Sequence, residues 1–76
     1  MMRRYTIILE ADSEEEGYTV TIPALPGCIT QGDTVEQCID RAHEAIRGYV
    51  ESLRAAGEQV PEKKGHPRMI TIDVDV

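Results

Sequence analysis

The sequence contains no tryptophan and no phenylalanine, and three tyrosines are its only aromatic residues. The chain must therefore build its core mainly from aliphatic side chains, because large aromatic anchors are few. Cysteine is also scarce: Cys28 and Cys38 lie ten residues apart, without the C-x-x-C spacing of metal knuckles and redox pairs. We expect both cysteines to be reduced thiols.

Long apolar runs are missing as well. No stretch approaches the roughly 18 consecutive apolar residues of a membrane-spanning helix, and no apolar run follows the opening Met1-Met-Arg-Arg. We therefore expect a cytoplasmic protein that does not enter a membrane.

Basic residues are outnumbered, with 8 Lys and Arg against 14 Asp and Glu, which gives a formal net charge of −6. Phosphate binding needs a basic surface, so this balance argues against direct binding of DNA or RNA. A basic protein is the partner that such a charge favours.

The residues that are present describe one small globular domain over residues 1–76, with 41% apolar and 29% charged residues. A chain of this size buries only about 60% of the surface that its unfolded form exposes. Its stability alone should be marginal, so we expect a partner or a second copy of the chain.

Alternating apolar residues predict two strands near the N-terminus, over residues 5–11 and 17–22. One face of the first strand carries Tyr5, Ile7, Leu9 and Ala11, and one face of the second carries Tyr18, Val20 and Ile22. The loop of about five residues between them makes an antiparallel hairpin. It contains the acidic residues Asp12, Glu14, Glu15 and Glu16. Such a run is more often a solvated turn than a docking patch, and both interpretations stay open.

Residues 23–34 combine a turn, a short strand and a helix cap. Pro23 has no amide hydrogen to donate and should end the second strand, and Pro26-Gly27 is a turn dipeptide. Residues 28–31 are predicted to form a third strand, after which Gly32 frees the backbone to bend. Either Asp33 with Glu36 or Thr34 with Gln37 has the spacing of a capping box at the start of a helix.

A helix is predicted over residues 35–56, because its apolar residues recur at steps of three and four. They are Val35, Ile39, Ala42, Ile46, Tyr49 and Leu53. Gly57 is placed to end the helix as a left-handed residue. Gly48 costs about 1 kcal/mol relative to alanine, which suggests close packing or a weak point.

Residues 58–67 read as a loop, and residues 69–76 alternate again as a fourth strand. The order β-β-β-α-β is of the α+β class. A right-handed crossover through the helix would place the fourth strand parallel to the first. The prediction is a four-stranded mixed sheet of order 3-2-1-4 with one long helix on one face.

These features resemble the N-terminal domain of the HicB-like antitoxin family, and the likeness extends over nearly the whole chain. The matching residues are Tyr5, Glu10, Gly17-Tyr18, Pro23-x-Leu25-Pro26-Gly27-Cys28, Gln31-Gly32-Asp33-Thr34, Glu36, Ala42, Ala45-Ile46 and Tyr49. The resemblance implies a truncated RNase H-like fold and a role in neutralising a small basic RNA-cleaving toxin of the HicA type. Many members continue into a DNA-binding segment, which is not expected in this chain.

Alternatives to an antitoxin are an orphan regulatory domain and a divalent-metal nuclease. Nuclease activity would use carboxylates such as Glu10, Glu36 or Glu44, and Asp73, but these are predicted on two different faces. The two histidines, His43 and His66, lack the spacing of a catalytic or zinc site with Cys28 and Cys38. We therefore predict no catalysis, no metal and no cofactor.

Partner binding is assigned to Glu14, Glu15 and Glu16 on the loop and to Tyr49 and Leu53 near the end of the helix. The predicted helix is about 33 Å long and overhangs strands of about 20 to 23 Å. A homodimer could use this overhang or the threonine-rich sheet face that carries Thr6, Ile8 and Thr19. Alternatively, Val60 and Pro61 fold over the overhang and that sheet face stays wet.

Overall fold

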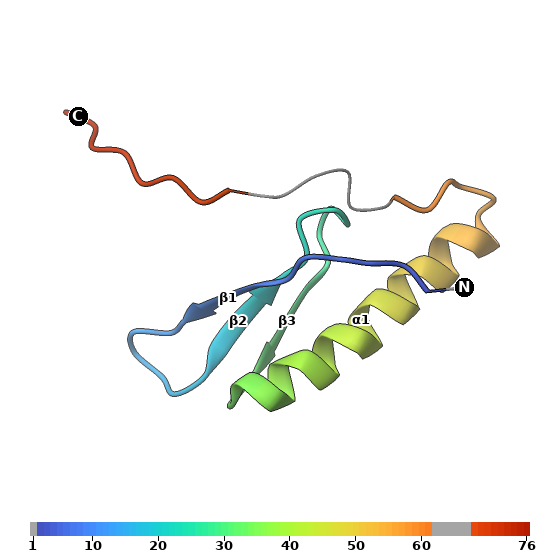
Figure 1. The fold of residues 1–76 in the computed structure, drawn as a ribbon, viewed down its shortest axis with the longest axis horizontal. Helices are drawn as coiled ribbons and strands as arrows, with labels where there is room; N and C mark the ends of the chain where they lie inside the picture. Colours follow the sequence, from blue (N-terminus) through green and yellow to red (C-terminus); the bar gives the residue numbers. More distant parts are fainter. Residues whose placement is uncertain (1, 62–67) are drawn as a thin grey trace.

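A computed structural model describes residues 2–61 and 68–76. It contains strands β1 (Ile8–Ala11), β2 (Tyr18–Thr21) and β3 (Ile29–Gly32), followed by helix α1 (Val35–Ala55). Figure 1 shows the sheet beside the single long helix. The α+β class and the three consecutive antiparallel strands are confirmed.

The strands are shorter than predicted, at four residues each. In β1 and β2, Ile8 lies opposite Thr21 and Leu9 opposite Val20. Continuing this register places Pro23 opposite Thr6, and proline cannot donate to the ladder. The segment before Ile8 is therefore extended but unpaired, although its inward residues Tyr5 and Ile7 still pack on the core.

The turn between β2 and β3 is confirmed and contributes to the core. The Ile22 amide donates to the Cys28 carbonyl at 3.1 Å, and the Cys28 amide donates to the Leu25 carbonyl at 2.9 Å. Gly27 has φ +79°, a conformation that favours glycine. The turn folds Leu25 inward until its side chain is fully buried.

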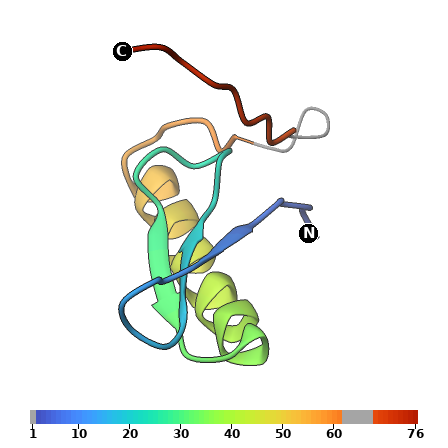
Figure 2. The same cartoon turned by 90° about the vertical axis from the view of Figure 1, so that its left-hand side faces the viewer.

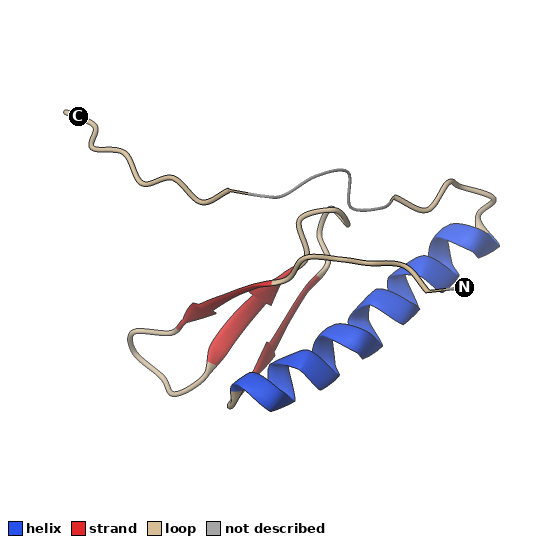
Figure 3. Ribbon diagram, viewed as in Figure 1, coloured by secondary structure: helices blue, strands red, loops and turns tan. Residues whose placement is uncertain are grey.

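Helix α1 packs against β3 and, to a lesser extent, β2, as the two views in Figures 2 and 3 show. The core is aliphatic, as the missing aromatics predict. Its buried residues are Val20, Ile22, Leu25, Cys28, Cys38 and Ala42. Val35 and Ile39 belong to the same helical stripe but remain 50% and 43% exposed. The helix thus offers apolar surface that the described part of the chain leaves uncovered.

Both ends of α1 follow the sequence signals. Thr34 is the N-cap, and its side chain accepts a hydrogen bond from the Gln37 amide at 3.0 Å. The Gln37 side chain reaches back to the Asp33 amide, so the Thr34–Gln37 register is the one used. At the other end Gly57 has φ +73° and closes the helix.

Gly32 has a role that the sequence did not reveal. Its φ is not positive, so the bend into the helix does not depend on a left-handed conformation of this glycine. A β-carbon built on Gly32 would lie 2.9 Å from both the amide nitrogen and the Sγ of Cys38. The glycine is required because the helix approaches β3 closely. Gly48, by contrast, has open space around it, which removes close packing as its explanation.

The predicted fourth strand is not found in the sheet of this chain. Residues 68–76 carry no strand assignment, are exposed throughout and lead away from the sheet in both ribbon views (Figures 1 and 2). The sheet order is β1-β2-β3, which leaves β1 as a free edge. The segment has the alternation of a strand, but alternation alone does not supply a hydrogen-bonding edge. The predicted loop over 58–67 lies partly outside the described residues.

Candidate partner-binding site

The acidic loop has a defined backbone. Asp12 Oδ1 accepts hydrogen bonds from the amides of Glu14 and Glu15 at 2.9 and 3.2 Å, and the Asp12 amide donates to the Gly17 carbonyl at 3.1 Å. The two amide donors hold the pKa of Asp12 below its ordinary value of 3.8, because they stabilise the charged carboxylate. Asp12 thus organises the loop and directs the three glutamates into solvent, where all are exposed.

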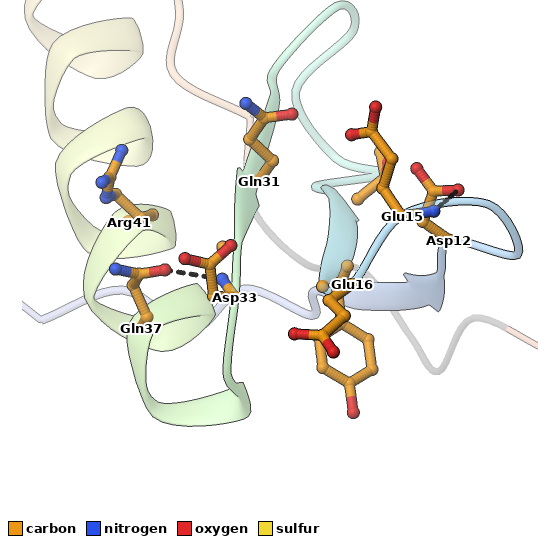
Figure 4. Close-up of a pocket in the computed structure, with 11 residues that line it drawn as sticks. Asp12, Glu15, Glu16, Gln31, Asp33, Gln37 and Arg41 are labelled. Carbon is orange, nitrogen blue, oxygen red and sulfur yellow. Dashed lines mark hydrogen bonds between the residues drawn. The ribbon is translucent and has the colours of Figure 1, made fainter.

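A polar hollow of about 280 Å³ lies between this loop and the start of α1 (Figure 4). It forms because Tyr18 pairs with Gly32, which brings the β1–β2 turn beside the end of β3. Its charged lining residues are Asp12, Glu15, Glu16, Asp33 and Arg41. Four carboxylates against one guanidinium make the hollow acidic, so it suits lysine or arginine side chains of a partner.

Two of the residues predicted to bind a partner, Glu15 and Glu16, line the hollow, and their role in binding stays a prediction. The sequence did not indicate Asp33 and Arg41 as their neighbours. Asp33 was interpreted only as a cap residue, and Arg41 was given no role. The signal that could have found them is the strand register: once Tyr18 lies opposite Gly32, Asp33 must lie next to the acidic loop. Glu14 does not line the hollow, although it belongs to the same exposed loop.

Tyr49 and Leu53 lie toward the other end of α1. From Gln37, which lines the hollow, to Tyr49 the helix rises by about 18 Å at 1.5 Å per residue. The Tyr49 hydroxyl donates to the Pro26 carbonyl at 2.7 Å and its ring packs on the core. The structure therefore does not bring Tyr49 and Leu53 together with the three glutamates. Tyr49 fastens the helix to the β2–β3 turn, and its role in partner binding stays a prediction.

The residues considered for catalysis are scattered. Glu10 on β1 and Glu36 and Glu44 on α1 are all exposed, and His66 lies outside the described residues. Within residues 2–61 and 68–76, no three His, Cys, Asp or Glu side chains come close enough to hold a metal ion.

The two thiols occupy apolar surroundings. Cys28 and Cys38 are free and buried, and burial raises the pKa of the Cys28 thiol above its ordinary value. A raised pKa lowers the thiolate fraction near neutral pH and with it the reactivity of the thiol. Both cysteines act as small core residues, as the sequence suggested.

None of the helices in the described part of the chain is long and apolar enough to cross a membrane. The three-stranded sheet, the single long helix and the acidic hollow define a small α+β domain with an acidic surface hollow. Residues 5–72 match the family of HicB-like antitoxins of bacterial toxin–antitoxin systems. The chain belongs to this family.

Curated relatives agree with this assignment. The chain is 47% identical over 58 residues to a UPF0150 protein of Thermoplasma acidophilum, an alignment that covers 76% of this chain and 83% of that protein. It is 44% identical over 59 residues to a UPF0150 protein of Synechocystis, covering 78% of this chain and 73% of the relative. It is also 38% identical over 58 residues to a protein of Photorhabdus laumondii named Antitoxin HicB 1. That alignment covers 76% of this chain but only 37% of the named antitoxin.

Proposed function

We propose that this chain is an antitoxin that binds a small basic RNA-cleaving toxin of the HicA type and blocks it. The observation that carries the proposal is the family match over residues 5–72. The similarity to a protein named Antitoxin HicB 1 supports it. A cytoplasmic location and the absence of direct DNA contact belong to the same proposal and agree with the net charge of −6.

The acidic hollow is the surface that we assign to the toxin. A toxin that binds RNA carries basic side chains on its RNA-binding face, because phosphate contacts dominate that kind of affinity. Carboxylates of the loop and of Asp33 offer these side chains a replacement for phosphate. Occupation of the same basic residues would exclude RNA, which provides a mechanism of neutralisation without catalysis.

The test is the association rate between this chain and the small basic protein encoded next to it. Replacing Glu14, Glu15 and Glu16 by Gln should slow association about tenfold at low salt, because charge complementarity acts mainly on the on-rate. Added salt should narrow the difference, since the Debye length shrinks to about 8 Å at physiological ionic strength.

A matched control replaces Glu36, Glu44 and Glu58 by Gln. Both triple variants change the formal charge from −6 to −3, and all six residues are exposed. If the loop is the docking surface, only the loop variant loses its fast association. Equal slowing in both variants would mean that the loop acts only through its contribution to the net charge. If the control variant associates more slowly than the loop variant, the interface lies nearer to Tyr49 and Leu53.

An orphan domain without a toxin is the alternative. It would show no complex with the neighbouring basic protein at micromolar concentration in either variant or in the wild-type chain. Complex formation therefore separates the two functions before the surface itself is tested.

A further inference from the structure

We propose that residues 69–76 of one copy of this chain pair with the free edge of β1 in a second copy, and that the two copies exchange these strands reciprocally. The inference does not depend on the proposed toxin. It concerns a second open surface, a groove that lies apart from the acidic hollow.

The groove runs between the segment that leads into β1 and the uncovered face of α1. It has a volume of about 720 Å³, and Tyr5, Ile7, Ile39, Ile46 and Val50 form its apolar lining. It is open because α1 packs over β3 and β2, so that the region beside β1 has no covering layer. Within residues 2–61 and 68–76, β1 pairs only with β2, so one of its edges has no described strand beside it. The site is therefore shaped for one more strand with one apolar face.

The segment 69–76 has the properties of that missing strand. Ile70, Ile72, Val74 and Val76 alternate with polar residues, and each of the four is at least 62% exposed. Apolar side chains on one face of an extended segment are stabilised by a covering surface. In the groove lining Ile39 is 43% exposed and Tyr5, Ile7 and Ile46 are half-buried, so the groove has apolar area left to cover. The period of two fixes which face of the segment enters the groove.

Charge also selects this occupant. Four of the eight basic residues of the chain line the groove, namely Arg3, Arg4, Arg47 and Arg54, together with a single acid, Glu51. The segment carries Asp73 and Asp75 and no basic residue after Arg68. An acidic strand is attracted to this rim at long range, whereas a basic toxin is repelled from it. The groove therefore favours an acidic partner, and the hollow favours a basic one.

The position of the segment favours a second copy. The Tyr5 hydroxyl donates to the Pro61 carbonyl at 2.7 Å, which fixes the chain after α1 at the entrance of the groove. From Arg68 onward the chain nevertheless leads away from its own sheet (Figures 1 and 2). One chain thus supplies both an unpaired segment and a free sheet edge, which are the two elements that a strand-exchanged dimer needs. Strand exchange is a low-cost route to a dimer. The sheet order 3-2-1-4 is then completed between copies.

The first test measures the mass of the particle by sedimentation at micromolar concentration. The wild-type chain should be a dimer, and the double variant Ile70→Asp, Ile72→Asp should be a monomer that keeps its helical circular dichroism. The matched control, Met69→Asp with Thr71→Asp, adds the same charge on the other face of the segment and should remain a dimer. A wild-type monomer at every concentration, or a variant that still forms dimers, would overturn the proposal.

The second test separates exchange from pairing within one chain. One copy carries Thr6→Cys and another carries Thr71→Cys; the two are co-expressed and treated with a short bismaleimide. Exchange predicts a covalent dimer on a denaturing gel, while each variant alone gives monomer, since Cys28 and Cys38 are buried. Placing both changes in one chain provides the comparison. If the double variant is crosslinked within one monomer and the mixture of single variants gives no covalent dimer, the strand folds back on its own copy and the proposal is wrong.

Discussion

Gly32 is the residue at which the fit between sheet and helix is tightest. We expect Gly32→Ala to lower the free energy of unfolding by about 1 to 3 kcal/mol, the usual cost of overpacking a core. The backbone amide of Cys38, 2.9 Å from the added carbon, cannot move as a flexible side chain can. Urea denaturation followed by circular dichroism measures the change.

Gly48→Ala is the control for this measurement, because the added carbon meets nothing within 4 Å. Alanine in an exposed helix interior should raise the free energy of unfolding by about 1 kcal/mol. Two glycine-to-alanine changes in one protein thus have opposite expected signs. Equal effects in the two variants would show that the close approach of α1 to β3 is absent.

Asp12 makes the stability of the acidic loop depend on pH. Its pKa is lowered by the amides of Glu14 and Glu15, so its contribution to stability is present above the unfolded value of 3.8 and is lost as pH falls through the lower folded value. A carboxyl titration by nuclear magnetic resonance should place the Asp12 midpoint below 3.8. Glu14→Pro removes the stronger donor and should move the midpoint upward. A wild-type midpoint at or above the ordinary value would mean that the loop is not organised by Asp12.

At the level of elements, the start of α1 offers a prediction that separates the two capping registers. Thr34→Ala should cost about 1 kcal/mol, because the Gln37 amide loses its acceptor. Thr34→Ser keeps a hydroxyl and should cost much less. In the other register Asp33 would be the cap, and Asp33→Ala would then be the costlier change. Thermal or urea unfolding of the three variants decides between them.

Helix α1 was predictable because all of its signals are local. The steps of three and four from Val35 to Leu53, the Thr34 cap and Gly57 lie within one stretch of sequence, and the observed bounds differ from the predicted ones by a single residue at the end. Local signals of this kind are reliable because each depends on neighbours along the same helix.

The strands were predicted in place and pairing but not in extent. Alternation from Tyr5 onward correctly identified the inward face, yet pairing starts only at Ile8 because β2 ends before Pro23. For residues 69–76 the same alternation predicted a strand beside the first one, and the described sheet contains only β1, β2 and β3. Which edge a strand joins depends on contacts between distant segments, or between copies, which alternation does not encode.

The candidate site was predictable in its charge and not in its shape. The sequence alone shows four acids near Gly17, whereas the hollow also needs Asp33 and Arg41 from later elements. Tyr49 was predicted to bind a partner, but its hydroxyl is used within the chain, on the Pro26 carbonyl. A half-buried aromatic residue on a helix gives no sequence signal that separates these two uses.

On the scale of the whole molecule, charge is unevenly distributed. Four carboxylates gather at the hollow, and four arginines gather along the groove, in a chain whose net charge is −6. The two surfaces should therefore respond to different variants: loop acids should alter toxin association, and groove or segment changes should alter self-association. This separation means that failure of one proposal leaves the other intact.

The most direct test of the antitoxin role is RNA cleavage by the neighbouring basic protein, measured while this chain is titrated into the reaction. We predict that cleavage falls to background near equimolar antitoxin, and that the chain alone gives no cleavage with magnesium or manganese. Undiminished cleavage at a large molar excess of the chain would contradict the antitoxin role, as would metal-dependent cleavage by the chain itself that is lost in Asp73→Asn.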